Sequence, residues 1–139
     1  MAYWLVKSEP DAFSWAQLVK TGAKGEPWTG VRNHTAKLNL MAMKKGDRAF
    51  YYHSNEGKEI VGIAEVIKTA YPDPTAKDGP WVCVDIKALA PLETPATLAA
   101  IKTNTKLKDM ALVKLSRLSV QPVTEAEWAL VCKMGGVKG

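Results

Sequence analysis

Residues 48–69 read RAFYYHSNEGKEIVGIAEVIKT, and this stretch decides what framework the chain can build. Aromatic and β-branched residues on either side of Ser54–Lys58 predict two strands, Arg48–His53 and Glu59–Thr69. The Asn and Gly between them are turn formers, so the two strands are expected to form a hairpin. Gly62 marks a place for a bulge or for the close approach of another group to the backbone. A sheet is therefore the expected framework.

Three further segments have strand patterns. Tyr3–Lys7 carries apolar residues on both faces, which predicts a central strand that ends before Pro10. Trp81–Leu89 alternates between apolar and polar residues, which indicates one buried face. Ser119–Gln121 is expected to form a short last strand before Pro122.

Short helices are expected at the connections between strands. Ser14 and Thr124 each stand three residues before a Gln or Glu, which is the spacing of a capping box. The predicted helices are Ser14 to about Lys20, Asn33 to Met41 or Met43, a short helix opened by Thr94-Pro95, a helical or turn-rich piece over Leu107–Leu118, and Thr124 to Gly135. Five or so strands with such helices predict an α+β fold on a twisted, partly closed sheet.

The composition is that of a folded protein. The 139 residues fit one domain over residues 1–139, and 47% are hydrophobic and 24% charged. No apolar run approaches the roughly 18 residues that a membrane helix needs, and residues 1–7 lack the pattern of a secretory signal. We therefore expect a cytoplasmic location without membrane association.

The two cysteines indicate neither a disulfide framework nor a metal site. Cys83 and Cys132 each lie among apolar residues, the setting of a buried thiol. The chain has no CxxC motif and no Cys/His cluster. No metal and no cofactor are therefore expected.

The charge balance favours an anionic partner. Nineteen basic residues against fourteen acidic ones give a net charge of +5 and an isoelectric point near 9.2. Such a balance attracts polyanions such as nucleic acids, although many basic proteins bind none. The three arginines, Arg32, Arg48 and Arg117, are the scarcer candidates for a specific contact.

Several loops combine polar side chains with aromatic ones, as a pocket for a nucleobase requires. Glu9 is a candidate acceptor for an exocyclic amine such as that of cytosine, Ser8 and Asn33 are candidates for further hydrogen bonds, and Arg32 for stacking or a phosphate. Candidate walls are Trp15, Trp28, Tyr52 and Tyr71.

Core packing is the competing interpretation for the aromatic residues. A tryptophan at a helix start, such as Trp15, is more often core than pocket wall. Trp28, in a Gly-rich loop, is evenly balanced between the two interpretations, whereas Trp4, Trp81 and Trp128 fit core patterns. His53, at a strand end, is more often structural than catalytic.

Seven strings, in order along residues 2–134, resemble the EVE domain family. They are Tyr3–Pro10 (YWLVKSEP), Trp28–Asn33 (WTGVRN), Gly46-Asp47, Tyr52–Asn55 (YHSN), Ile60–Val66 (IVGIAEV), Tyr71–Thr75 (YPDPT) and Arg117–Val123 (RLSVQPV). The resemblance implies a PUA-like pseudo-barrel of five or six mostly antiparallel strands with short helices at its ends, related to the YTH and ASCH domains.

The resemblance also implies a pocket for a modified base, with modified cytosines in DNA the favoured ligands. By this likeness the pocket residues are Ser8, Glu9, Trp28, Val31, Arg32, Asn33, His53 and Ser54, with Trp15 and Tyr71 beside them. Two features depart from the family. His34 stands where relatives often have tyrosine, and Thr75–Pro80 is shorter than the corresponding loop, so one wall and the contacts to flanking nucleotides are in question.

The expected function is therefore a non-catalytic, nucleic-acid-binding domain, for DNA or RNA, that accommodates a modified base. One alternative is a regulatory module that binds a small molecule, a nucleotide or a protein. Another is an enzyme acting on a modified nucleotide, with His53, Ser54 and Glu9 as base, nucleophile and partner. No nucleophile elbow, metal set or phosphate loop accompanies these three residues. The oligomeric state cannot be read from this pattern.

Overall fold

The predicted hairpin is the centre of a six-stranded sheet in the computed structural model, which describes residues 1–139. The strand order is β2-β5-β4-β3-β1-β6. The strands are β1 (Tyr3–Ser8), β2 (Glu26–Pro27), β3 (Arg48–His53), β4 (Glu59–Pro72), β5 (Val82–Thr97) and β6 (Val120–Val123). Only β1 and β3 pair in parallel, so the expectation of a mostly antiparallel sheet with an interior first strand is confirmed.

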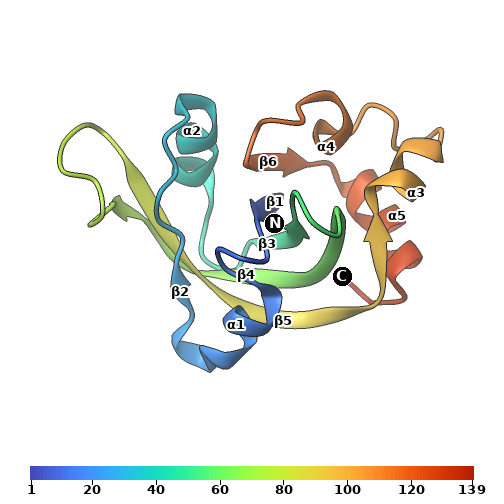
Figure 1. Cartoon of the computed structure of the whole chain (residues 1–139), viewed down its shortest axis with the longest axis horizontal. Helices are drawn as coiled ribbons and strands as arrows, with labels where there is room; N and C mark the ends of the chain where they lie inside the picture. Colours follow the sequence, from blue (N-terminus) through green and yellow to red (C-terminus); the bar gives the residue numbers. More distant parts are fainter.

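The sheet curves strongly but does not close into a barrel. Its two end strands, β2 and β6, each pair with one neighbour and not with each other. Helix α2 (His34–Ala42) lies across this opening and contacts β4, β5 and β6. In Figure 1 this helix lies between β2 and β6. The α+β, PUA-like fold is thus confirmed, with an open sheet whose two ends face each other beneath a helix.

Short helices occupy the connections. They are α1 (Trp15–Lys20), α2, α3 (Leu98–Thr103), α4 (Ala111–Lys114) and α5 (Glu125–Gly135), with a 3₁₀ turn over Gly22–Lys24. Both predicted capping boxes form, at Ser14 and at Thr124. The Asn33 side chain accepts a hydrogen bond from the Ala36 N–H at 2.9 Å and so begins α2 as predicted. No helix is long and apolar enough to cross a membrane.

Three predicted boundaries are wrong, because the strands run further than their patterns indicate. The last strand does not stop before Pro122 but continues to Val123, paired with β1. Thr94-Pro95 does not open a helix. β5 continues to Thr97, because Ala96 and Thr97 pair with β4 and residues 92–95 lie in a bulge, where a proline without an N–H is tolerated. Likewise β4 continues past Thr69 to Pro72, opposite Val82.

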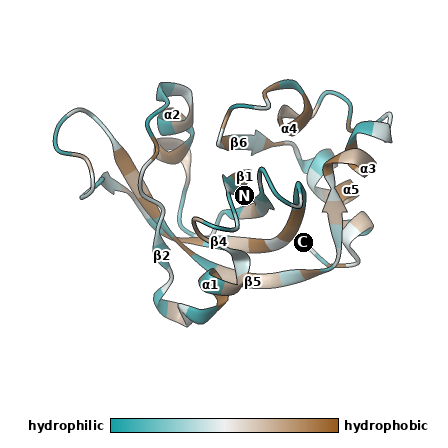
Figure 2. Cartoon of the chain, viewed as in Figure 1, coloured by the Kyte–Doolittle hydropathy of each residue, from teal (hydrophilic) through white to brown (hydrophobic).

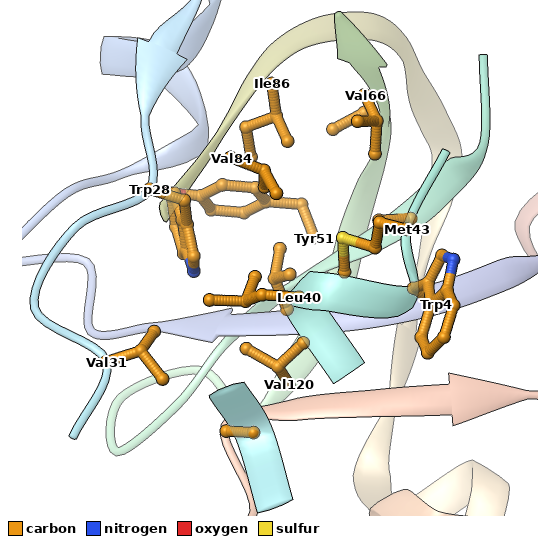
Figure 3. Packing of buried hydrophobic residues seen from close by; sticks show 14 of the residues in the cluster. Trp4, Trp28, Val31, Leu40, Met43, Tyr51, Val66, Val84, Ile86 and Val120 are labelled. Atoms are coloured by element: carbon orange, nitrogen blue, oxygen red, sulfur yellow. The ribbon is translucent and has the colours of Figure 1, made fainter. Parts of the chain in front are cut away.

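Apolar residues fill both faces of the sheet, and Figure 2 shows the hydrophobic colouring concentrated along the strands. Alternation along β1 and β3 divides them: Trp4, Val6 and Tyr51 pack on one face, and Leu5 and Phe50 on the other. Figure 3 shows the first face, where Trp28, Tyr51, Leu40 and Val120 meet under α2. The second face is covered by α3, α4 and α5.

Some single predictions are settled by burial. Trp4 and Trp128 are core residues as expected, and both cysteines are buried free thiols. Trp81 is not core. It precedes β5 in an exposed connection and stays half-exposed, packed against the exposed His34 ring, because the strand that would bury it begins one residue later.

Gly62 fulfils both roles that the sequence suggests. The register of β4 shifts against β3 and β5 next to Gly62, which marks a bulge. A Cβ atom at Gly62 would lie 2.5 Å from ring carbons of Trp15, so the indole rests directly on the backbone of β4. Trp15 also meets Tyr51 edge to face, with ring centroids 5.6 Å apart. The bare backbone at Gly62 therefore fixes the start of α1.

We predict that Gly62→Ala lowers the free energy of unfolding by about 1–3 kcal/mol, because the added methyl group must displace Trp15 from a packed position. Urea unfolding measures this cost. In a Trp15→Leu background the same substitution should cost less than half as much, since the ring it strikes is gone. An equal cost in both backgrounds would contradict the contact.

Candidate functional site

A cavity of about 410 Å³ opens where the two ends of the sheet fail to meet. One side is formed by the end of β1 and the loop after it, the other by β2 and the loop that follows. The lining residues are Lys7, Ser8, Ala12, Phe13, Glu26, Pro27, Trp28, Thr29, Gly30, Val31, Arg32 and Ser119. The volume lies in the range of about 300–1,000 Å³ that is usual for sites of small ligands.

Trp28 is at once a core residue and a wall of the cavity. Its backbone N–H donates to the Val84 carbonyl at 2.7 Å, which fixes the residue to β5. Its indole meets Tyr51 edge to face at 5.5 Å and Phe13 at 6.4 Å, and only 8% of the residue is exposed. Both interpretations of Trp28 therefore apply, and the cavity has a rigid aromatic side.

Polar groups gather around the buried Tyr51 hydroxyl. It donates to the Phe13 carbonyl at 2.6 Å, which ties the loop before α1 to β3. Burial raises the pKa of Tyr51 well above its usual range; a hydrogen bond with Ser8 lowers it in part, and the nearby negative charge of Glu26 raises it further. Tyr51 is thus a neutral phenol at physiological pH, flanked by Ser8 and Glu26 of the cavity.

Two cations lie among the lining residues. The Lys7 Nζ donates to the Ser116 carbonyl at 2.6 Å, and burial lowers the pKa of Lys7. Arg32 keeps 40% of its side chain exposed and lies over the ring of Trp81, 5.8 Å from its centroid. Each cation thus has a partner within the chain and brings positive charge to the lining of the cavity.

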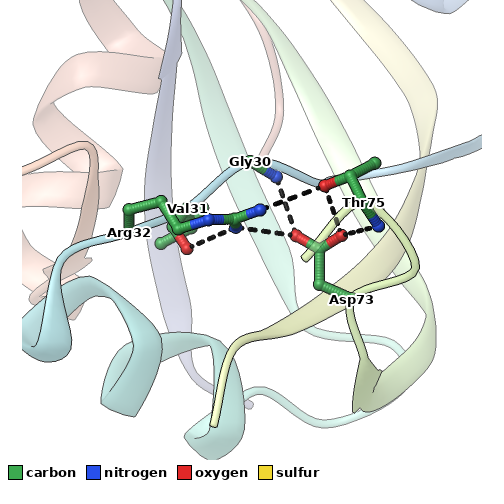
Figure 4. Close-up of polar contacts among 5 residues, drawn as sticks. All are labelled: Gly30, Val31, Arg32, Asp73 and Thr75. Carbon is green, nitrogen blue, oxygen red and sulfur yellow. Dashed lines mark hydrogen bonds and ion pairs between the residues drawn. The ribbon is translucent and has the colours of Figure 1, made fainter. Parts of the chain in front are cut away.

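Asp73 holds the cavity loop in place (Figure 4). Its carboxylate accepts hydrogen bonds from the Gly30 N–H at 2.8 Å, from the Thr75 N–H and hydroxyl at 2.7 and 2.6 Å, and from Arg32 at 3.1 Å. Burial alone would raise the pKa of Asp73, but these donors outweigh it and lower the pKa to about 2. The β4–β5 connection and the loop after β2 are joined at this carboxylate.

Four of the ten predicted site residues line the cavity: Ser8, Trp28, Val31 and Arg32. Three others stand behind it and support its wall. The His53 Nε2 accepts from the Trp15 N–H at 3.0 Å, and the Ser54 N–H donates to the Ser8 carbonyl at 3.0 Å. Burial lowers the pKa of His53, with the charge of Glu59 opposing in part, and the ring must be neutral at Nε2 to accept this bond.

The remaining three predicted residues lie outside the cavity. Glu9 is exposed, Asn33 caps α2 beside a separate small hollow that it shares with Arg117, and the Tyr71 hydroxyl donates to Asp85 toward the far end of β4. No hydrogen bond joins His53, Ser54 and Glu9, so the structure does not assemble them as a catalytic trio.

Sequence reasoning missed several lining residues. Glu26 lies in the Gly-rich loop before Trp28 and Lys7 at the end of the first predicted strand, and neither is among the ten predicted site residues. A usable signal was present in both cases: Glu26 directly precedes Pro27 and Trp28, and Lys7 precedes Ser8 in one of the family strings. Asp73 lies in another of these strings, Tyr71–Thr75, and its role depends on contacts with Gly30 and Arg32, which are distant in the chain.

The two departures from the family pattern meet at one place. The His34 ring lies 4.8 Å from that of Trp81, tilted by 31°, and Arg32 lies over the same indole. The short Thr75–Pro80 segment leads directly into Trp81. His34 is therefore not a wall of the cavity but part of an exposed cluster next to its mouth, with Arg32 shared by both.

A second hollow, of about 560 Å³, lies on the other face of the sheet beside Trp128 and Tyr3. It contains none of the ten predicted residues. No group of three or more His, Cys, Asp or Glu side chains is arranged to hold a metal ion.

We predict that Asp73→Asn lowers the free energy of unfolding at pH 7 by about 1–3 kcal/mol, because one charged acceptor serves four hydrogen bonds. The pKa is lowered in the folded state, so this stabilisation is complete above the ordinary pKa near 3.8 and is lost as pH falls toward about 2. In urea unfolding, the difference in the free energy of unfolding between wild type and variant should be smaller at pH 3 than at pH 7. A difference independent of pH would contradict the role of the charge.

Comparison with known proteins places the chain in a family. The sequence profile of the EVE domain matches residues 2–134. Mouse thymocyte nuclear protein 1 is 37% identical over 164 residues, covering 95% of this chain and 73% of that protein. The NMR structure of Rpa0253 from Rhodopseudomonas palustris is 71% identical with a TM-score of 0.93, covering 98% and 94% of the two chains. A crystal structure of the human THYN1 protein in complex with 5-methylcytosine-containing DNA is 31% identical with a TM-score of 0.90 and full coverage of both chains. The chain belongs to the EVE domain family.

Proposed function

We propose that this protein is a single, non-catalytic domain over residues 1–139 that binds nucleic acid and accommodates one modified base, with modified cytosine favoured, in the cavity between the sheet ends. The observation that carries the proposal is the aromatic and polar cavity at this position, in a fold that superposes over its whole length on the human THYN1 protein in complex with 5-methylcytosine-containing DNA.

The cavity has the physical features that a flipped base requires. Stacking on an aromatic ring contributes about 1–3 kcal/mol per base, which offsets much of the few kcal/mol needed to take a base out of a duplex. Trp28 and Phe13 offer apolar surface for such contact. Trp28 packs against both Phe13 and Tyr51, so these side chains lose little conformational entropy when a base binds. Lys7 and Arg32 supply positive charge for the neighbouring phosphates.

The other two candidate functions are supported less well. A catalytic role needs its groups within reach of one another, and His53 is instead engaged with the Trp15 backbone. A module for a free nucleotide would use the same cavity but would not need the net charge of +5. The cytoplasmic location expected from the sequence stays a prediction.

Titration of labelled oligonucleotides tests the proposal. Single- and double-stranded DNA and RNA carry cytosine, 5-methylcytosine, 5-hydroxymethylcytosine, adenine or N6-methyladenine at one central position, each at two salt concentrations. We expect binding that weakens with salt and a several-fold preference for a modified cytosine. Because Trp28 is also core, Trp28→Ala would cost about 3–5 kcal/mol of stability, so Trp28→Phe is the better variant.

Trp28→Phe should reduce the preference for the modified base several-fold, since the larger ring surface is lost. The matched control is Trp128→Phe, the same change at a tryptophan that is also buried, on the opposite face of the sheet, and it should leave the preference unchanged. Equal affinity for every base in the wild type would contradict a base reader. Salt-independent binding of a free nucleotide would favour the small-molecule module, and turnover lost in His53→Ala would favour an enzyme.

A further inference from the structure

Glu26 is a half-buried carboxylate in the cavity that has no partner within the chain. The three ion pairs of the structure are Arg32–Asp73, Lys87–Glu65 and Lys114–Asp109. Glu26 belongs to none of them and takes part in no side-chain hydrogen bond. Its carboxylate oxygens therefore keep their full capacity to accept hydrogen bonds from solvent or from a ligand.

Two nearby donors, the Tyr51 hydroxyl and the Lys7 ammonium group, make their hydrogen bonds with other residues. The Tyr51 hydroxyl donates to the Phe13 carbonyl, although it is near enough to Glu26 for that charge to raise the pKa of Tyr51. Lys7, the cation in the same cavity, donates to the Ser116 carbonyl. The acceptor oxygens of Glu26 are therefore free for a ligand that brings its own N–H donors.

The backbone that carries Glu26 is held firmly. Glu26 pairs with Ile86 and Pro27 with Asp85, so β2 is part of the sheet. Gly25, with a φ of 70°, lies so close to β5 that a Cβ atom would clash with the Ile86 carbonyl oxygen. The backbone of Glu26 is therefore held in the sheet two residues before Trp28, in the lining of the cavity.

A carboxylate of this kind distinguishes bases by the hydrogen-bonding group that they present. Ionised glutamate can only accept hydrogen bonds. Cytosine and 5-methylcytosine carry an amine at C4, which donates, whereas thymine and uracil carry a carbonyl oxygen there, which can only accept. Thymine and 5-methylcytosine have the same 5-methyl group, so an apolar wall alone separates them poorly.

We propose that Glu26 is the specificity-determining residue of the cavity, accepting a hydrogen bond from the exocyclic amine of a 4-aminopyrimidine and thereby rejecting thymine and uracil. This inference rests on the proposed function, since it assumes that a base enters the cavity. It assigns the acceptor role to Glu26 rather than to Glu9, which lies outside the cavity.

The test compares single-stranded DNA oligonucleotides that differ only at one position, which carries 5-methylcytosine, cytosine, thymine or N4,N4-dimethylcytosine. The wild type should bind 5-methylcytosine on the order of tenfold more tightly than thymine. It should also bind N4,N4-dimethylcytosine as weakly as thymine, because that base has no N–H at the amine. This arm needs no variant and so does not depend on the folding of one.

Two variants extend the test. Glu26→Gln should narrow the ratio between 5-methylcytosine and thymine, because an amide can donate to the thymine carbonyl as well as accept. Glu26→Leu should abolish the ratio, because it removes both the acceptor for the 5-methylcytosine amine and the unfavourable approach of a carboxylate to the thymine carbonyl. Glu9→Gln is the matched control and should keep the wild-type ratio, since Glu9 is exposed and outside the cavity.

The outcomes separate this inference from the proposed function. If the wild type prefers 5-methylcytosine to cytosine but binds thymine or the dimethylated base equally well, the cavity reads the methyl group alone and Glu26 has no such role. An unchanged ratio in both Glu26 variants has the same meaning. If no base is distinguished from any other, the proposed function itself fails.

Discussion

Curvature without closure is the constraint on which the rest of this structure depends. The long strands β4 and β5 bend the sheet until β2 and β6 face each other, yet these ends share no hydrogen bonds. Helix α2 covers the opening, and residues of the β2 loop, with Trp28 foremost, fill part of it from inside. What is left unfilled is the cavity, so the proposed binding site is a direct consequence of how the sheet ends.

The cavity keeps its shape because the loops around it are attached to the sheet and to one another. Asp73 ties the loop after β2 to the β4–β5 connection, and Tyr51 ties the loop before α1 to β3. Behind them, Trp15 rests on the bare backbone of Gly62 and donates to His53. The carboxylate of Glu26, by contrast, takes part in none of these contacts and in none of the ion pairs.

Local sequence patterns predicted what depends on neighbours in the chain, and failed where distant contacts decide. The hairpin at residues 48–69, the bulge at Gly62 and the caps of α1, α2 and α5 follow from short-range chemistry and are confirmed. The extension of β5 past Pro95 depends on pairing with β4, which no local signal announces. Glu9 and Glu26 both precede a proline, and only the position of β2 beside β5 decides which of them lines the cavity.

The central claim, that the gap between the sheet ends receives the base, can be tested with the indole N–H signals of the five tryptophans in a ¹⁵N-labelled sample. A short single-stranded DNA containing 5-methylcytosine is added while these signals are followed by NMR. The account predicts that the Trp28 signal shifts most, and that Trp128, beside the hollow on the opposite face, stays unchanged. A shift of Trp128 with an unmoved Trp28 signal would place the ligand on the other face of the sheet and contradict the account.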